Sequence, residues 1–372
     1  MAYLGENIKK LGFGFMRLPM IGQEIDIEQT KEMVDLYMSK GFSYFDSSWA
    51  YIGGKSEEAM KTAIVDRYPR ESFQIATKCP VWLVKTEKEA KDMIWTSLKR
   101  TGAGYIDYYL LHNLGDGRTK IFDDFGMWDY VRELKDKGMV KHIGFSIHDN
   151  ADVLDKILTE HPEMEFVQFQ LNYGDWESPT IQARKCYEVA LKHKKPIIVM
   201  EPVKGGALAN PVDSVGKIFK DADSSASLAS WAIRYAASLD NIITVLSGMS
   251  TLEQVQDNVS FMENFKPLSE EEQMIIEKAR KVLQEIPNIP CTACEYCIEG
   301  CPKNIRIPHV FAAYNRKLVY NDLASAKGNY GFETIASGKA SECIACGNCE
   351  GVCPQHINII DNLKVIAEEL EK

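Results

Sequence analysis

The first part of the chain, up to about Phe265, alternates short apolar runs rich in β-branched and aromatic residues with longer amphipathic stretches. This alternation is typical of repeated strand–helix units. The apolar runs predict eight strands, over residues 10–15, 43–47, 73–78, 106–112, 140–146, 166–172, 196–201 and 242–248. The periodicity between them predicts helices, over residues 27–40, 57–65, 87–100, 124–137 and 225–237. Gly41, Gly102 and Gly138 follow three of these stretches, as glycine often does where a helix ends.

Eight parallel strands with helical crossovers can close into a barrel or form an open, doubly wound sheet. A G-x-G-x-x-G motif does not follow an early strand, although Gly12-Phe13-Gly14 offers part of one. This argues against a dinucleotide-binding Rossmann half. The count of eight favours a (β/α)8 TIM barrel, so we expect an α/β fold with the barrel over residues 1–268.

The composition changes after the barrel. A charged helical stretch over residues 269–285 leads to Pro287 and Pro290, where the chain becomes rich in cysteine. We expect a connecting helix over residues 269–286 and a separate domain over residues 287–372. Helical patterns over residues 307–317 and 322–327 predict that this second domain is small and mainly α-helical.

Eight of the ten cysteines occur in two copies of the pattern C-x2-C-x2-C-x3-C-P. Ferredoxins hold two [4Fe-4S] clusters with this run, in which three cysteines ligate one cluster and the fourth ligates the other. The pattern assigns one cluster to Cys291, Cys294, Cys297 and Cys353, and the second to Cys343, Cys346, Cys349 and Cys301. Paired structural zinc sites are the alternative, but the repeat of the whole pattern with its proline favours a ferredoxin-like domain. Cys79 and Cys186 lie outside the repeats and are expected to be ordinary buried thiols.

Ionisable side chains lie where the predicted strands of the barrel end. Asp46 ends the second strand, Tyr51 follows in its loop, Lys78 ends the third strand and His112 ends the fourth. Active sites of such barrels lie at the carboxyl ends of the strands. Packing explains each residue alone, but a set of four at one mouth is difficult to ascribe to chance.

This set of side chains suits the reduction of a carbonyl group. A tyrosine has an ordinary pKa of about 10, and a neighbouring lysine is expected to lower it by stabilising the phenolate. Tyr51 is then a candidate proton donor. Asp46 would hold Lys78 in place, and His112 would hydrogen-bond the carbonyl oxygen and orient the substrate.

At these residues the chain resembles the aldo-keto reductase family, from about Lys9 to Phe265. The matching segments are Tyr44-Phe45-Asp46-Ser47-Ser48 with Tyr51, Gly54-Lys55-Ser56-Glu57, Ala76-Thr77-Lys78, Asp107-Tyr108-Tyr109-Leu110-Leu111-His112 and Gly144-Phe145-Ser146. The resemblance implies NAD(P)H-dependent reduction of a carbonyl to an alcohol, or the reverse reaction. It also implies cofactor-binding residues, with Ser146, Gln168 and Asn172 around the nicotinamide carboxamide, and Gln254 and Asn258 near the adenosine end.

Some positions depart from the family pattern. Met200 stands where an aromatic ring commonly stacks on the nicotinamide, and His148 lies near the mouth in the segment where the family usually has a Ser-Asn pair. Gly248 and Gln254 stand where a lysine and an arginine often bind the 2′-phosphate, so the cofactor is NADP or NAD. Ser250 is expected to cap a helix, with Glu253 completing a capping box, or to help seat a cofactor phosphate there.

Charge and hydropathy limit the classes of partner that we expect the protein to bind. The chain has 43 Lys and Arg against 53 Asp and Glu, a net charge of −10, and no basic run, so nucleic acid is not an expected partner. Neither a signal peptide nor a membrane-spanning run is evident, and we expect a cytoplasmic protein that does not engage a membrane.

The sequence leaves two functions open. The first is an aldo-keto reductase-like enzyme acting on a small-molecule carbonyl or alcohol, with clusters in a structural or electron-relay role. The second is an iron-sulfur electron-transfer or redox-sensing protein, with a redox partner protein, whose barrel binds nicotinamide mainly as a ligand. The set around Tyr51 favours the first. The clusters favour the second. A hydride carries a pair of electrons while a cubane normally accepts one electron at a time, so hydride transfer alone does not explain two clusters.

Overall fold

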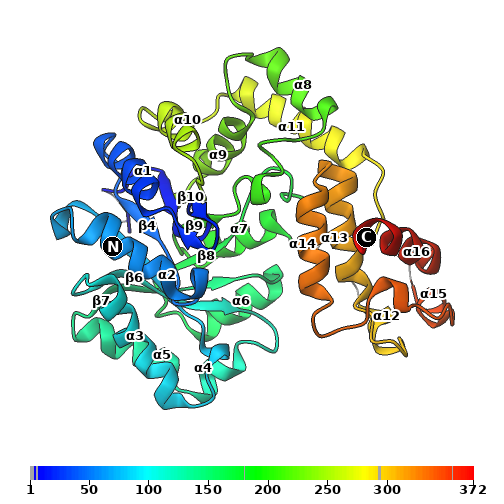
Figure 1. Ribbon diagram of the computed structural model, residues 1–372, viewed down its shortest axis with the longest axis horizontal. Coiled ribbons are helices and arrows are strands. Elements are labelled where there is room, and N and C mark those ends of the chain that lie inside the picture. The colour runs from blue at the N-terminus through cyan, green and yellow to red at the C-terminus, as the bar shows by residue number, and fades with distance from the viewer. Residues whose placement is uncertain (1–3, 6, 180, 292–294, 354) are drawn as a thin grey trace. The chain divides into compact units, whose positions relative to one another are not determined.

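Eight strands of the described residues form one closed parallel barrel with helices around it (Figure 1). They are β1 (Leu11–Gly14), β4 (Tyr44–Asp46), β5 (Gln74–Cys79), β6 (Ile106–Leu114), β7 (Val140–Ile147), β8 (Phe166–Gln170), β9 (Ile197–Met200) and β10 (Ile242–Ser247). Strand β10 pairs with β1 and closes the barrel, with Phe13 opposite Ser247. The predicted strands and the predicted barrel are confirmed.

The computed structural model describes residues 4–5, 7–179, 181–291, 295–353 and 355–372. These residues divide into two compact units. The first contains the barrel and comprises the described residues up to Glu177, with Ile181–Val203 and Ser230–Glu270. The second comprises residues 178–179, Lys204–Ala229 and the described part of Glu271–Lys372. The segment that follows β9 therefore groups with the C-terminal unit.

Side chains on the barrel strands alternate between the interior and the helix-covered outside, as the period of two in a strand requires. On β4, Tyr44 belongs to the apolar cluster inside the barrel, whereas Phe45 belongs to the larger cluster beneath the helices. Ala76 on β5 and Leu110 on β6 also belong to the interior cluster. Two residues further along each strand, the same alternation places Asp46, Lys78 and His112.

Helices cover the outside of the barrel. They are α1 (Ile27–Ser39), α2 (Lys55–Met60), α3 (Glu87–Thr101), α4 (Lys120–Asp124), α5 (Met127–Asp136), α6 (Ala151–Glu160), α7 (Ala183–Lys192), α9 (Leu228–Ser238) and α10 (Leu252–Met262). Short helical turns and a hairpin fill the loops: η1 (Phe15–Arg17), β2 (Met20–Ile21), β3 (Glu24–Ile25), η2 (Tyr51–Gly54), η3 (Lys61–Val65), η4 (Arg70–Ser72) and η5 (Val81–Leu83).

Two of the predicted helices are interrupted. The helix expected over residues 124–137 is divided into α4 and α5, because Gly126 between them has a φ of 59° and cannot continue a right-handed helix. The helix expected over residues 57–65 begins earlier, at Lys55, and its last five residues form the π-helical turn η3. The helix expected from residue 225 begins at Leu228 as α9.

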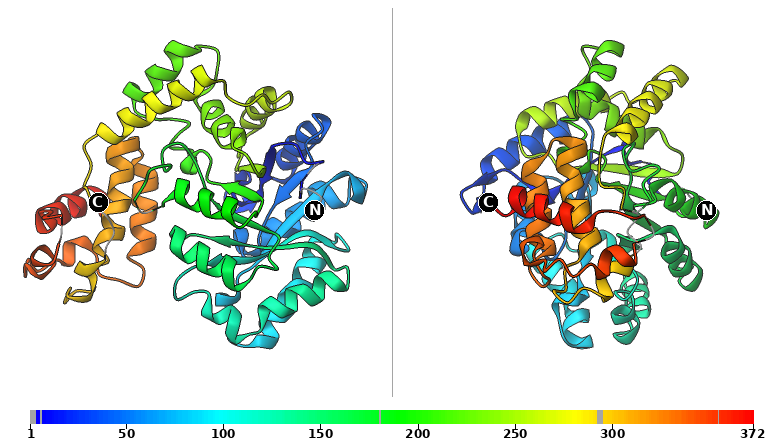
Figure 2. Two further views of the ribbon diagram at one scale, coloured as in Figure 1. Left: turned by 180° about the vertical axis from the view of Figure 1, so that it is seen from behind. Right: turned by 90° about the vertical axis from the view of Figure 1, so that its right-hand side faces the viewer.

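The second unit is mainly helical. It contains η6 (Lys204–Gly206), α8 (Asp213–Ala222), most of α11 (Glu270–Glu285), α12 (Tyr296–Glu299), α13 (Ile307–Tyr320), α14 (Leu323–Glu333), η7 (Ala340–Glu342), α15 (Asn348–Gly351) and α16 (Ile359–Leu370). Helices α13 and α14, drawn in orange, lie side by side in Figures 1 and 2. Val310 and Phe311 of α13 and Ile366 of α16 are fully buried in its core. The helices of the described ranges include none that is long and apolar enough to cross a bilayer.

Candidate active site and cysteine-lined cavity

Asp46 and Lys78 form a buried ion pair at the carboxyl ends of β4 and β5. Asp46 is 3% and Lys78 1% exposed. The ammonium of Lys78 donates to Asp46 Oδ1 and to the carbonyl oxygen of Ser47, the latter at 2.7 Å. A buried charge is tolerated only when it is paired and hydrogen-bonded, and these partners satisfy that requirement. The positive charge of Lys78 is thereby fixed inside the mouth of the barrel.

Tyr51 begins the turn η2 beside this ion pair. Its ring centroid lies 4.9 Å from Lys78 Nζ and 5.9 Å from the ring centroid of His112. The structure therefore brings the four predicted residues to one mouth. The turn itself is unusual, because Ile52, Gly53 and Gly54 have φ values of 51°, 64° and 91°, and a β-branched residue rarely adopts a positive φ.

Burial is the largest influence on the pKa of Tyr51 and raises it above the ordinary value of 10.0. The charge of Lys78 acts in the opposite direction but offsets only part of the effect of burial. Our expectation that Lys78 lowers the pKa of Tyr51 below its ordinary value is therefore wrong. The physical reason is that the groups packed around the half-buried tyrosine remove water from the phenol, which disfavours the phenolate. For Lys78 itself, burial opposes the charge, but Asp46 and Tyr51 outweigh burial and raise its pKa.

His112 is held as a neutral imidazole. Burial, followed by the charges of Lys78 and His148, lowers the pKa of His112 well below 6.5. Its Nδ1 lies 3.0 Å from the hydroxyl oxygen of Ser48. The sequence analysis assigned no role to Ser48, although its position two residues after Asp46 could have indicated that it turns toward the same mouth. Trp82 lies against the other side of the site, with its ring centroid 5.1 Å from that of His112.

The residues expected at the nicotinamide differ in how much hydrogen-bonding capacity they retain. Gln168 donates from Nε2 to Asp46 Oδ2 at 3.1 Å, and the Ser146 hydroxyl oxygen accepts from the backbone N–H of Asn113 at 2.8 Å. Asn172 is fully buried, and its side chain is engaged by its own loop and by the loop after β9. Its Nδ2 donates to Asp175 Oδ2 at 2.7 Å and to the carbonyl oxygen of Glu201 at 3.0 Å.

The residues expected near the adenosine end lie where β10 leads into α10. Thr251 caps α10, because its side chain accepts from the backbone N–H of Gln254. The expected capping box of Ser250 and Glu253 is therefore wrong by one residue. Ser250 instead donates its hydroxyl to the carbonyl oxygen of Arg17 at 2.7 Å, which anchors it outside the helix. Its backbone N–H donates to the side-chain oxygen of Gln254 at 2.7 Å.

Two further contacts complete this end. Asn258 is buried and donates to the hydroxyl of Ser247 at 2.7 Å. A Cβ at Gly248 would lie 3.2 Å from Cδ of Arg17, so the glycine lets the stem of Arg17 pack close to the backbone. Arg17 is exposed, and the sequence analysis did not single it out.

His148 lies at the rim of the same mouth. Its backbone carbonyl accepts from Arg118 at 2.9 Å, and Arg118 also donates to the carbonyl oxygen of Asn113. Although part of the ring is exposed, the loss of surrounding water and then the charges of Arg118 and Lys78 lower the pKa of His148 to about 4. His148 is therefore neutral above this pH.

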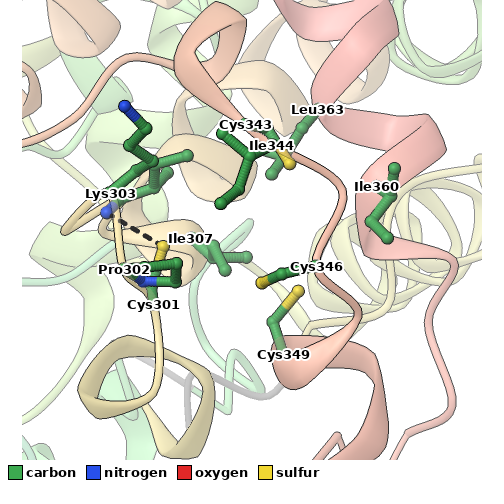
Figure 3. A pocket seen from close by; sticks show the side chains of 11 residues that line it. Cys301, Pro302, Lys303, Ile307, Cys343, Ile344, Cys346, Cys349, Ile360 and Leu363 are labelled. Carbon is green, nitrogen blue, oxygen red and sulfur yellow. Dashed lines mark hydrogen bonds between the residues drawn. The ribbon is translucent and has the colours of Figure 1, made fainter.

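In the second unit, four cysteines from both copies of the repeat line one cavity. Figure 3 shows Cys301, Cys343, Cys346 and Cys349 around this space, together with apolar side chains such as Leu363. The cavity and its opening enclose about 320 Å³. The Cys301 Sγ accepts from the backbone N–H of Ile305 at 3.4 Å. These are the four thiols that the repeat assigns to one cluster.

The other set of cysteines is described in part. Cys294 lies outside the described residues, while Cys297 is buried and Cys291 and Cys353 pack against the same apolar core. Within the described ranges, cysteine, histidine and acidic side chains nowhere converge in a group of three as they would around a single metal ion. Cysteine thiolates are the ligands of a [4Fe-4S] cubane, and four of them line this cavity.

The two cysteines outside the repeats are buried, as expected. Cys79 is 0% and Cys186 3% exposed, and burial raises the pKa of each thiol to about 12. Both remain protonated thiols at neutral pH, which makes them poor nucleophiles and poor metal ligands.

Comparisons with known proteins agree with this arrangement. The aldo/keto reductase family matches residues 10–281, and the 4Fe-4S dicluster domain family matches residues 290–358. A probable voltage-gated potassium channel subunit beta from Arabidopsis thaliana is 25% identical over 325 residues, which cover 77% of this chain and 96% of that protein.

Solved structures show the same barrel. An aldo-keto reductase from Bacillus halodurans in its holo form has a TM-score of 0.61 at 23% identity, over 74% of this chain and 94% of that chain. An aldo-keto reductase from Klebsiella pneumoniae in complex with NADPH has a TM-score of 0.58 at 17% identity, over 73% and 90% of the two chains. The family match spans most of the chain, and this protein therefore belongs to the aldo/keto reductase family of oxidoreductases, with a 4Fe-4S dicluster domain following its barrel.

Proposed function

We propose that this enzyme reduces a small-molecule carbonyl to an alcohol, or catalyses the reverse oxidation, with Tyr51 as the proton donor. Bound NADPH or NADH would supply the hydride. The observation that carries the proposal is the buried Lys78–Asp46 ion pair beside a tyrosine that burial keeps protonated. This pairing supplies both a proton and a fixed positive charge at one point in the mouth.

Tyr51 would donate the proton, and Lys78 would stabilise the phenolate that remains. A raised pKa keeps the phenol of Tyr51 protonated at neutral pH, so the proton is present when the carbonyl oxygen begins to gain negative charge. As the proton leaves, the phenolate is stabilised by the Lys78 ammonium, whose position Asp46 fixes. In the oxidation direction the same phenolate would accept the proton.

His112 orients the carbonyl by hydrogen bonding. With its pKa well below 6.5 it carries one N–H rather than two at neutral pH. When the Ser48 hydroxyl donates to Nδ1, the hydrogen of His112 resides on Nε2, from which it can be donated to the carbonyl oxygen. In this arrangement Ser48 favours the tautomer of His112 that can donate a hydrogen bond to the carbonyl oxygen of the substrate.

The residues present fit a nicotinamide cofactor. Gln168 uses its amide N–H group on Asp46, which leaves its oxygen to accept from a carboxamide, and the hydroxyl of Ser146 can still donate. Asn172 contributes by fixing Glu201 rather than by direct contact. At the other end, the N-terminus of α10 with Gly248, Ser250, Gln254 and Asn258 offers a seat for the adenosine phosphates, and the exposed Arg17 adds positive charge.

For the second unit we propose two [4Fe-4S] clusters. One is held by Cys301, Cys343, Cys346 and Cys349, and the other by Cys291, Cys294, Cys297 and Cys353. Cysteines in this number and pattern suit the reducing cytoplasm, where we place the protein. An electron-transfer or redox-sensing role is the second candidate function, favoured by the exposure of Cys346, which would leave one edge of its cluster open to a protein partner.

Replacement of Tyr51 tests the first function. In Tyr51→Phe, we expect kcat for the reduction of a panel of aldehydes and ketones to fall by about 10²-fold or more, because the proton donor is lost. Nicotinamide affinity and iron content should be unchanged. Tyr187→Phe is the matched control, since Tyr187 donates its hydroxyl to the carbonyl oxygen of Asp240, outside the site. Full reductase activity in Tyr51→Phe would refute the proposed role.

A further inference from the structure

We propose that Arg100, on α3, is a positioning residue that holds the strained turn carrying Tyr51 in its working conformation. The kinetic part of this inference rests on the proposed function, and the structural part does not. Arg100 touches neither the predicted substrate position nor the predicted cofactor position. It acts through the backbone carbonyl of Trp49 before Tyr51 and through the carboxylate of Glu57 after it.

The turn after Tyr51 needs an external restraint. Ile52, Gly53 and Gly54 all have positive φ values. Two glycines adopt such values at little cost, but for the β-branched Ile52 they are strained. Strained backbone persists only where the surrounding structure over-determines it, and such strain is concentrated at functional sites. Without a restraint, the turn would relax and move the phenol of Tyr51.

Arg100 supplies contacts on both sides of the turn. Its Nη1 donates to the carbonyl oxygen of Trp49 at 2.8 Å, and it lies 3.3 Å from a carboxylate oxygen of Glu57. The guanidinium carbon also lies 4.6 Å from the ring centroid of Trp49. Trp49 precedes Tyr51 by two residues and Glu57 follows it by six, so a single side chain joins the two ends of the turn.

Gly54 is required for this close approach. A Cβ at Gly54 would lie 2.7 Å from the guanidinium carbon of Arg100 and 2.7 Å from Nη2. Any side chain there would displace the guanidinium or the turn. The glycine at residue 54 therefore serves two needs at once, a φ of 91° and room for the cation.

Glu57 connects the turn to the strand that bears Lys78. Its side chain is fully buried, and its second carboxylate oxygen accepts from the hydroxyl of Thr77 at 2.7 Å. Thr77 immediately precedes Lys78 on β5. The chain of contacts from Arg100 through Glu57 to Thr77 thus fixes the distance between Tyr51 and Lys78. A lysine at position 100 would keep the charge but lose the planar, forked set of donors.

The test compares Arg100→Gln and Arg100→Lys with Arg70→Gln in the full, cluster-loaded chain. Arg70 is a matched control because it is also a partly buried arginine, paired with Asp107 and bonded to three backbone carbonyls at the opposite, amino-terminal end of β5 and β6. The first readout is hydrogen exchange of the backbone amides of residues 49–57. We expect exchange about tenfold or more faster in Arg100→Gln, an intermediate rate in Arg100→Lys, and the unmodified rate in Arg70→Gln.

The second readout is the division of the effect between kcat and KM. In Arg100→Gln we expect kcat per bound nicotinamide to fall about tenfold, because the proton donor is displaced. KM and cofactor affinity should stay within about twofold of their values in the unmodified protein, because the binding residues are not moved. Unchanged exchange over residues 49–57 in Arg100→Gln would overturn the inference, and so would an equal loss of kcat in Arg70→Gln.

The two proposals fail in different ways. If the unmodified protein reduces none of the carbonyls, the proposed function fails, while the exchange measurement still decides the role of Arg100. If Arg100→Gln does not fold, Arg100→Lys is compared with Arg70→Lys over the same nine amides. Faster exchange confined to Arg100→Lys supports the inference, and equal exchange overturns it.

Discussion

Tyr51, Lys78 and His112 share one mouth, in which Lys78 is buried and the other two are half-buried, but their surroundings favour different charge states. Burial favours the neutral form of Tyr51 and of His112, while the Asp46 carboxylate keeps Lys78 charged in spite of burial. Neutral donors beside one fixed cation can bind an uncharged carbonyl without first binding an anion. The site is thereby prepared for charge that develops only during the reaction.

This assignment predicts the pH dependence of carbonyl reduction. Because the pKa of His112 is well below 6.5, kcat/KM should show no step near pH 6.5. Because burial raises the pKa of Tyr51 above 10.0, the midpoint of the decline that follows from loss of the proton donor should lie above pH 10. The oxidation rate should instead rise with pH, since it needs the phenolate. A step near pH 6.5 that persists in His148→Asn would contradict the assignment to His112.

Strand alternation made part of the site predictable at the residue scale. Asp46, Lys78 and His112 lie at or near the ends of buried strands, and parallel strands in a barrel bring their carboxyl ends together. The net pKa of Tyr51 was not predictable in the same way, because it depends on how completely the folded barrel excludes water. Arg100 could not be recognised either, since it lies on the outer helix layer and acts on Tyr51 only through its contacts with Trp49 and Glu57.

At the scale of elements, the junction between β10 and α10 depends on which of two adjacent hydroxyl residues caps the helix. Ser250 and Thr251 both precede residues that could complete a capping box, so the sequence does not decide between them. The hydroxyl of Ser250 donates to the carbonyl oxygen of Arg17, so Ser250 does not cap α10. The cap is therefore set by a contact with a segment more than 230 residues away in the chain.

The cap can be tested through stability. Thr251→Ala should lower the free energy of unfolding of the barrel by about 1 kcal/mol, because a backbone N–H at the start of α10 loses its acceptor. Ser250→Ala should cost less, since its contact with Arg17 is exposed. Urea unfolding followed by the far-ultraviolet signal measures both. A larger loss in Ser250→Ala than in Thr251→Ala would contradict the observed cap.

The interrupted helices also show that the local sequence pattern does not predict where a helix ends. The apolar periodicity over residues 124–137 continues across Gly126, and it gives no sign that this glycine adopts a positive φ and starts a new helix. The eight strands were easier to predict, because each is a short buried run between polar segments. Period and composition identify elements well, whereas their ends depend on single hydrogen bonds and single φ angles.

At the scale of the whole molecule, the two copies of the cysteine repeat, far apart in the sequence, contribute thiols to one cavity. Cys301 belongs to the first copy of the pattern in sequence, yet it lines the cavity of Cys343, Cys346 and Cys349 from the second. Spacing and a known ligation rule were sufficient to predict that these four thiols lie around one space.

Pairs of cysteine substitutions test the exchange. If both residues ligate the same cluster, as we propose, Cys301→Ser and Cys349→Ser should each remove one cluster, and the double variant should lose no further iron. Combining Cys301→Ser with Cys297→Ser should remove both clusters. Iron analysis with electron paramagnetic resonance of the reduced protein measures the outcome. Additive iron loss in the Cys301–Cys349 pair would contradict the assignment.

The most direct test of the whole account is an anaerobic titration of the cluster-loaded protein with NADH and then NADPH, with and without aldehydes and ketones. Nicotinamide and iron–sulfur absorbance are followed together. We expect the nicotinamide to be oxidised only when a carbonyl is present, because the carbonyl carbon is the proposed acceptor of the hydride. Bleaching of the clusters by nicotinamide without any carbonyl, and no turnover when carbonyls are added, would contradict it and identify the protein as an electron conduit.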